Sequence, residues 1–310
     1  MKCPNCGKEI ANDSNFCEYC GTKLTKPVNR KKVLWTILTA LIALCMAGGI
    51  VKIVLNQQEK SAQNKDFTET AYGINMKMIW AEGGDFLMGC TSEQSDCYED
   101  EQNVRRVTVD GFYIGMLEVT QSQWEKVMGT SVYQQRDKAD TSWPMRGVGS
   151  DNPMYYVSWE EATEFCRLLS NKTGKTYTLP TEAQWEYAAR GGKKNEGTKY
   201  AGSNSIDAVA WYRYNSGEST HPCGTKRANA LGIYDMSGNV WEWCKDWYSS
   251  YMSYDTNNPT GPSSGSYRVY RGGSWYDGAG YCRVTNRNHY SPGNRGYNLG
   301  FRVVCIPKND

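Results

Sequence analysis

Histidine is scarce in this sequence, with only His221 and His289 among 310 residues. Two imidazoles exclude a site that binds its metal through three histidines. They leave room for one Ser-His-Asp triad, but no motif of that chemistry accompanies either histidine. An excess of charge is also absent, because the formal net charge is only +2. The sequence therefore lacks the basic surface of a nucleic-acid-binding protein, and we expect no nucleic-acid partner.

Phenylalanine is also uncommon, since 6 Phe stand against 11 Trp and 22 Tyr. Indole and phenol rings combine apolar area with a polar group, so they suit half-buried positions and binding surfaces better than a wholly apolar core. The 12 cysteines are numerous, and their placement matters more than their number. The length accommodates one large domain and small additional segments.

Two Cys-x-x-Cys-Gly motifs lie near the N-terminus, Cys3–Gly7 and Cys17–Gly21. Four thiolates on paired tight turns form a closed tetrahedral zinc site, and glycine permits the backbone of each turn. A segment this short cannot fold by apolar burial alone, so the metal supplies the folding free energy. A disulfide knot or a redox motif is the rival interpretation, but two paired motifs favour zinc. Residues 1–25 are therefore predicted to be a zinc ribbon that binds Zn²⁺ through Cys3, Cys6, Cys17 and Cys20.

One long uncharged run follows, from Val33 to Val51, and apolar residues continue beyond Lys52 to Leu55. A helix of about 20 residues spans the hydrocarbon core of a bilayer. The basic residues just before the run predict that its N-terminal side faces the cytoplasm. A signal peptide is the competing interpretation, but a folded ribbon before the run and the lack of a small-x-small cleavage site disfavour it.

These features predict a single-pass protein of the bacterial cytoplasmic membrane with its N-terminus in the cytoplasm. The predicted order is a basic linker at 26–32, a transmembrane helix at 33–55, a polar tether at 56–71 and an extracytoplasmic domain at 72–310. Ribbons of this size commonly serve as protein contacts, so a cytosolic protein is the expected partner of residues 1–25.

The large domain alternates short strands, glycine-rich turns and a few helices with clear start signals. Three pairs fit the capping box, in which Ser or Thr precedes Gln or Glu by three residues: Thr120 with Gln123, Ser158 with Glu161, and Thr181 with Gln184. Gly129 and Gly191 are stop signals. A helix at 159–170 would present one apolar face, formed by Ala162, Phe165, Cys166 and Leu169. The predicted class is α+β with much irregular structure.

A series of ordered motifs resembles the sulfatase-modifying-factor family, to which the formylglycine-generating enzymes belong. The motifs are Gly83–Gly89, Glu118–Thr120, Val157–Ala162, Leu179–Arg190, Asn229–Gly232, Ser237–Trp243, Arg271–Trp275 and Leu299–Arg302. The resemblance covers roughly residues 73–305. It implies a variant of the C-type lectin fold for the large domain.

The chemistry that this resemblance implies depends on two cysteines. Formylglycine-generating enzymes oxidise a substrate cysteine with O₂ and a copper ion, which is held by two cysteines shortly after the Gly-Gly-Ser motif. In this sequence only Cys282 follows Arg271–Trp275 at that distance. One thiolate cannot provide two-sulfur coordination of copper(I), so no copper is expected and Cys282 is catalytic only if the chain is an enzyme. The related iron-dependent sulfoxide synthases take histidines from an additional helical domain that this sequence lacks.

The resemblance also implies a structural calcium ion. The family loop that holds it matches Asp235, Gly238, Val240 and Glu242. The two acids would supply carboxylates and the other two residues backbone carbonyls, which are the hard oxygen ligands that calcium prefers. The alternative is that both acids only cap turns.

Seven cysteines follow the predicted membrane helix, in a compartment that permits disulfides. Cys90 and Cys97 bracket a short polar loop and are predicted to form a local disulfide. Cys166 and Cys305 resemble a pair of the family, although Cys305 lies two residues later than usual. Cys244 and Cys282 are the expected third pair, which leaves Cys223 as a free thiol.

The stretch 276–298 is rich in Tyr, Asn, Gly and Ser. This composition is also that of antibody paratopes, where rigid aromatic rings combine with adaptable polar groups. These residue types are moreover those that an Asn codon yields when only its adenines change. The stretch thus resembles the variable proteins of diversity-generating retroelements, which diversify the C-terminal end of the same lectin-like fold. An ordinary Asn- and Gly-rich surface loop is the alternative.

The leading hypothesis is a membrane-anchored module that binds an extracytoplasmic protein or glycan. Its predicted ligand face consists of Trp275, Tyr276, Tyr281, His289, Tyr290 and Tyr297. A formylglycine-generating oxidoreductase or another metal-dependent oxidase is the alternative from a different class. A purely structural envelope protein is the third, and buried tyrosines on this face would favour it.

Overall fold

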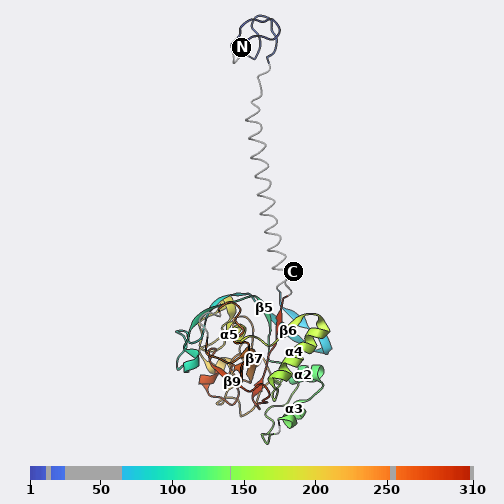
Figure 1. Cartoon of the computed structure of the whole chain (residues 1–310), viewed down its shortest axis with the longest axis vertical. Helices are drawn as coiled ribbons and strands as arrows, with labels where there is room; N and C mark the ends of the chain where they lie inside the picture. The colour runs from blue at the N-terminus through green and yellow to red at the C-terminus, as the bar shows by residue number, and fades with distance from the viewer. Residues whose placement is uncertain (12–14, 25–64, 140, 252–255, 308–310) are drawn as a thin grey trace. The chain divides into compact units, whose positions relative to one another are not determined.

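The computed structural model describes residues 1–11, 15–24, 65–139, 141–251 and 256–307 (Figure 1). The chain divides into two units, Met1–Asn64 and Lys65–Asp310, which are described separately. The predicted basic linker at 26–32 and transmembrane helix at 33–55 lie outside the described residues. Within the ranges that are described, no helix is both long enough and apolar enough to cross a bilayer.

The N-terminal unit is organised around its cysteines. Cys3 and Cys17 are buried and pack with Ile10 and Leu24 in a small apolar cluster. Each Cys-x-x-Cys-Gly motif closes a tight turn, because the amide of its glycine donates to the carbonyl of its first cysteine. Gly7 and Gly21 have φ angles of 71° and 67°, a conformation that glycine adopts without steric cost.

The helices of the large unit are α2 (Gln121–Met128), α3 (Val132–Lys138), α4 (Trp159–Thr173), α5 (Glu182–Ala189) and the short α6 (Ile206–Val209). Of these, α2, α4 and α5 begin where the capping boxes predict. All three predicted capping boxes are confirmed, and α3 has a fourth that the sequence analysis missed. The apolar face predicted for 159–170 is also confirmed, since its four residues are the buried ones of α4.

A five-stranded antiparallel sheet has the order β1-β2-β5-β11-β6. Its strands are β1 (Phe67–Glu69), β2 (Met76–Ala81), β5 (Phe112–Gly115), β11 (Val304–Ile306) and β6 (Thr176–Thr178). Figure 1 shows α4 beside β6 and α2, against which it packs. β1 places the start of the domain before residue 72, so the tether predicted for 56–71 is wrong at its end. Phe67 pairs with β2 and packs its ring on Tyr113, which makes it part of the sheet.

A second sheet of four strands has the order β10-β7-β8-β9. Its strands are β10 (Leu299–Gly300), β7 (Trp241–Trp247), β8 (Arg268–Arg271) and β9 (Arg287–Tyr290), and β3 (Gly84–Met88) pairs with β4 (Arg105–Val109) in a separate ribbon. Four 3₁₀ turns complete the described elements: η1 (Ala71–Gly73), η2 (Glu99–Glu101), η3 (Gly192–Lys194) and η4 (Ala279–Cys282).

Buried arginine–carboxylate pairs hold together the irregular segments of the large unit. Arg302 donates from Nε and Nη2 to Glu242 at 2.6 Å each. Arg283 also binds Glu101 through two hydrogen bonds, from Nη1 at 2.5 Å and from Nη2 at 2.6 Å, and both side chains are fully buried. Bidentate charge-assisted hydrogen bonds fix geometry strongly. The core thus relies on Trp, Tyr and paired Arg, which explains how it manages with little phenylalanine.

One of the three predicted disulfides is confirmed. Cys90 and Cys97 are bonded, whereas Cys166, Cys305, Cys244, Cys282 and Cys223 are free thiols. The prediction of a Cys166–Cys305 bond is wrong: both cysteines pack in the same apolar cluster, but both are free thiols.

The Cys244–Cys282 prediction is wrong because the two thiols pack in different apolar clusters. Cys244 lies on β7, in the cluster beneath the five-stranded sheet. Cys282 ends η4 and packs instead with Tyr200 and Tyr212.

Candidate functional site

The four ribbon thiols form one compact group. Sγ of Cys3 lies 3.7 Å from Sγ of Cys20, and Sγ of Cys6 lies 3.6 Å from Sγ of Cys17. All four sulfur atoms lie within 4.8 Å of one another. Tetrahedral ligands with Zn–S bonds of about 2.3 Å are roughly 3.8 Å apart, so the group fits a zinc ion and leaves the thiols unbonded to each other. A hydrogen bond with the Thr22 hydroxyl lowers the pKa of Cys20 to about 6, which favours the thiolate that zinc requires.

The predicted calcium loop fits a metal only in part. Asp235 is buried, its Oδ2 accepts from the Gly224 amide at 2.6 Å, and its Oδ1 is buried without a hydrogen-bond partner. Both oxygens of Glu242 are already engaged, because Arg302 binds them and the Trp185 indole donates to Oε2 at 2.7 Å. Glu242 is therefore poorly suited to the ligand role that the family resemblance implied.

A different acid, Glu118, lies beside Asp235. A carboxylate oxygen of each residue and Sγ of Cys223 all lie within 4.8 Å of one another. Both oxygens of Glu118 accept hydrogen bonds, Oε1 from the Val240 amide at 3.1 Å and Oε2 from Asn239 at 2.8 Å and Cys223 at 3.2 Å. These donors are neutral, whereas Glu242 is held by the guanidinium of Arg302. Burial raises the pKa of Asp235 to about 6, and burial together with Asp235 raises the pKa of Glu118 well above its usual range. Two carboxylates that are costly to ionise together would be stabilised by a cation.

The C-terminal stretch lines a cavity of about 190 Å³ on the four-stranded sheet. Its lining residues are Trp241, Tyr270, Tyr276, Asp277, Asn288, Tyr290, Gly296, Tyr297, Asn298 and Leu299. We call this cavity the tyrosine pocket. β7, β8, β9 and β10 each contribute to it, and the remaining residues come from the loops that follow β8 and β9. The pocket thus combines side chains of a regular sheet with side chains of the irregular loops that follow β8 and β9.

Three of the predicted tyrosines, Tyr276, Tyr290 and Tyr297, line the pocket. Tyr276 and Tyr290 are exposed by 42% and 44%. Tyr281 is 38% exposed and contacts the pocket residue Trp241, with ring centroids 6.3 Å apart. The ring of Tyr297 is held between Tyr276, at 5.5 Å, and Trp143, at 4.5 Å. Four of the predicted tyrosines thus lie in or beside the pocket, and Tyr276, Tyr281 and Tyr290 are accessible.

Two residues of the predicted face lie elsewhere. Trp275 is only 1% exposed and supports the pocket from below, packed against Tyr276 and Tyr297. His289 alternates with the pocket residues of β9 and lies opposite the buried Val269, so it points to the other side of the sheet, where its ring stacks on Tyr248 at 4.0 Å.

Sequence analysis missed Trp241, Tyr270, Asp277, Asn288 and Asn298. Two of them precede the stretch 276–298, on β7 and β8, so its composition could not indicate them. The signal that could have found Trp241 is the alternation Trp-Glu-Trp, which places Trp241 and Trp243 on one face of a strand.

Asp277 is the acidic residue of the pocket. Its Oδ2 accepts hydrogen bonds from the Trp241 indole at 2.8 Å and from the Ser274 hydroxyl. Asn298 donates to the Ser274 hydroxyl at 2.8 Å and so completes this network. Burial raises the pKa of Asp277, although these hydrogen bonds act in the opposite direction. The side chain is thus held in one orientation on the pocket wall.

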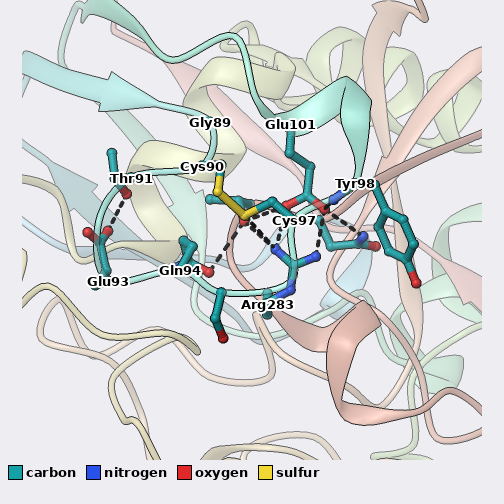
Figure 2. The surroundings of a disulfide bond; sticks show 12 residues. Gly89, Cys90, Thr91, Glu93, Gln94, Cys97, Tyr98, Glu101 and Arg283 are labelled. Atoms are coloured by element: carbon teal, nitrogen blue, oxygen red, sulfur yellow. Dashed lines mark hydrogen bonds and ion pairs between the residues drawn. A yellow bond between two sulfur atoms is a disulfide. The ribbon is translucent and has the colours of Figure 1, made fainter.

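The loop closed by the Cys90–Cys97 disulfide, shown in Figure 2, supports the edge of this face. Tyr98 follows Cys97 and stacks on Tyr281 with ring centroids 5.9 Å apart. Arg283 points from the C-terminal stretch into the loop, where it pairs with Glu101 and contacts Sγ of Cys97 at 3.5 Å. The exposed tyrosine therefore rests on a covalently closed and ion-paired support.

The thiol of Cys282, the one catalytic candidate, is sealed from solvent. Cys282 is fully buried, and burial raises the pKa of its thiol. Gly273 approaches it so closely that a Cβ at that position would lie 2.7 Å from the sulfur. A catalytic thiol must instead be accessible and easily ionised.

Comparisons with known proteins agree with this architecture. A zinc-ribbon model matches residues 2–24, and the model of the sulfatase-modifying factor enzyme 1-like domain matches residues 63–306. The chain is 32% identical to the chaperone protein LppX of Paenibacillus barcinonensis, over 74% of this chain and 90% of that protein. It is also 32% identical to the formylglycine-generating enzyme of Mus musculus, over 74% of this chain and 75% of that protein.

A solved structure with the same fold also matches the chain. The variable protein 1 of Treponema denticola is 32% identical, superposes with a TM-score of 0.68, and the match covers 78% of this chain and 99% of that one. The predicted zinc ribbon, family and C-type lectin-like fold with mixed helix and sheet are thereby confirmed. The chain belongs to the family of the sulfatase-modifying factor enzyme 1-like domain and carries a zinc ribbon ahead of that domain.

Proposed function

We propose that the large unit is a ligand-binding module whose binding site is the tyrosine pocket. The observation that carries this proposal is the convergence of accessible tyrosines from 276–298 on one cavity above a rigid, ion-paired scaffold. Rigid aromatic rings provide contact area at a low entropic cost, and neighbouring Asn side chains provide adaptable hydrogen bonds. The accessible tyrosines also argue against a purely structural role. A protein or a glycan outside the cytoplasm is the proposed ligand.

The proposal includes a second part, that the amino acids of this face differ between sibling proteins. Exposed and buried residues alternate in the stretch: Tyr276, Tyr281 and Tyr290 are accessible, while Arg283 and Arg287 are buried in ion pairs. The likeness to a variable protein of Treponema denticola supports this part of the proposal. The test is to compare the gene among sibling isolates, where differences should fall on the accessible positions and spare the paired arginines.

The likeness to a formylglycine-generating enzyme makes cysteine oxidation the competing function. That activity requires two thiolates for copper, and the sequence of the stretch 276–298 contains one cysteine, the buried Cys282. Binding is therefore the better-supported function. The absence of bound copper in the purified protein stays a prediction.

We further propose that the module is displayed outside the cytoplasm on a single transmembrane helix at 33–55. The Cys90–Cys97 disulfide supports this location, because disulfides persist in oxidising compartments. Protease added to spheroplasts should therefore digest the chain beyond residue 65 and spare the ribbon, as followed with antibodies against each unit. Protection of the large unit until the membrane is permeabilised would contradict the proposed orientation.

A calcium ion at Asp235 and Glu118 is the proposed structural cofactor. In the cation-free protein the pKa of Asp235 is raised to about 6, above the value near 3.9 of an unfolded chain. The folded state then binds more protons in this interval, so stability should fall as pH rises from about 4 to 6. Calcium binds the deprotonated form and should reverse this loss.

We therefore expect Ca²⁺, added to zinc-loaded and calcium-free protein, to raise the melting temperature clearly at pH 7 and little at pH 5. Asp235→Asn should abolish the response to calcium. Scanning calorimetry with Mg²⁺ as the control ion measures both effects. An equal response to calcium in the variant would mean that the ion binds elsewhere.

A further inference from the structure

The tyrosine pocket contains a carboxylate that the protein does not neutralise. All side-chain hydrogen bonds to Asp277 arrive at Oδ2, from Trp241, Ser274 and Asn298, so Oδ1 stays available to a ligand. Among the described residues none forms an ion pair with Asp277. The guanidinium of Arg213 has an electrostatic effect on Asp277 and lies 6.0 Å from the ring centroid of Tyr276.

Aromatic rings form most of the remaining wall. Trp241 and Tyr270 meet at 79° with centroids 4.8 Å apart, and Tyr276 and Tyr297 meet at 87° with centroids 5.5 Å apart. Tyr290 adds a fifth ring. Rings that stand perpendicular to one another surround a ligand on several sides. The negative faces of such rings attract a cation, and they do so most strongly where the cation is desolvated.

The size and polarity of the pocket restrict the ligand further. A volume of about 190 Å³ accommodates one ammonium-bearing group but not a helix or strand of a peptide. The amides of Asn288 and Asn298 supply further polar contacts in the same cavity. A neutral sugar could also stack on tyrosine, but it would leave the charge of Asp277 without compensation, which is costly in a partly buried site.

We propose that the tyrosine pocket binds an organic ammonium ion, with Asp277 as its counter-ion and the five aromatic rings as its cage. This inference rests on the proposed function and specifies the ligand chemistry of that site. The ammonium group could belong to a small amine or to a lysine side chain, and both sources present the same chemistry to the pocket.

The test is calorimetric titration of the full chain at pH 7.5 with three probes: choline, its neutral isostere 3,3-dimethylbutan-1-ol, and N-acetyl-trimethyllysine amide. Choline should bind at least tenfold more tightly than the neutral isostere. Binding of choline alone would identify a small amine as the source, while tighter binding of the lysine derivative would identify a side chain. Asp277→Asn should remove the preference for charge, and Tyr290→Leu should weaken both cations about tenfold. Tyr133→Leu, which changes an exposed tyrosine on α3, is the control and should bind like the unaltered chain.

The pH dependence provides a second readout that needs no variant. Because burial raises the pKa of Asp277, choline affinity should fall as pH falls through that pKa, while binding of the neutral isostere should not change. Equal affinity for choline and its isostere, or unchanged choline binding by Asp277→Asn, would overturn the inference. If the cations fail while the accessible tyrosines still vary between isolates, the proposed function stands and only the ligand chemistry is wrong.

Discussion

Replacing Glu101 by Gln should lower the free energy of unfolding of the large unit by about 3–5 kcal/mol, as expected when one partner of a buried ion pair is removed. Arg283 would keep its charge, fully buried, and would lose both its counter-ion and one of its two acceptor oxygens, because the Gln amide has a single oxygen. Thr285 would also lose its carboxylate partner. Urea unfolding followed by tryptophan fluorescence measures the change. A loss under about 1 kcal/mol would show that the pair does not fix the C-terminal stretch.

An exposed pair provides the matched control. Arg136 and Asp137 form an ion pair on α3, with side chains exposed by 35% and 66%. Asp137→Asn should change stability by less than about 1 kcal/mol, because water screens such pairs.

Burial would raise the pKa of Glu101, but the hydrogen bonds from Arg283 and Thr285 outweigh burial and lower it. A lowered pKa stabilises the fold above the unfolded value near 4.3, so this contribution should disappear as the solution is acidified.

Replacing Cys20 by Ser should abolish stoichiometric zinc binding and unfold residues 1–25. The four sulfur atoms form one closed group, and among the described residues of the ribbon the apolar cluster consists only of Ile10, Leu24 and the two buried cysteines. The apparent free energy of zinc binding in such small sites is about 10–16 kcal/mol, and it is the folding free energy as well. Metal analysis and amide exchange would measure both losses. A ribbon that stays protected after zinc is removed would contradict this account, and the large unit should not respond.

Local signals predicted the scaffold well. The capping boxes at Thr120, Ser158 and Thr181 placed the starts of three helices, because a capping box satisfies the free amides of a first helical turn with neighbouring side chains. The Cys90–Cys97 bond was also predictable, because its loop is short. Ordered family motifs then implied the lectin-like fold, which no local signal reveals.

Tertiary packing determined the features that local signals could not predict. Trp275 precedes the exposed Tyr276 in sequence, and only the bend after β8 decides which of the two reaches solvent. Glu242 matched a calcium loop, but Arg302, sixty positions later in the chain, binds both its oxygens. The composition of 276–298 does not distinguish Asp277 from its neighbours. Its place in the pocket wall depends on a hydrogen bond from Trp241, which lies on a distant strand.

The most direct test of the central proposal is the pattern of amino-acid differences in 276–298 among sibling isolates. A replaceable ligand face predicts that differences concentrate at accessible pocket positions such as Tyr276 and Tyr290, while Cys282, Arg283 and Arg287 stay constant. The codons that differ should do so mainly at positions that are adenines in Asn codons. An enzyme would need the same pocket residues in every isolate. Constant pocket residues, with differences spread evenly over the rest of the surface, would therefore contradict the account.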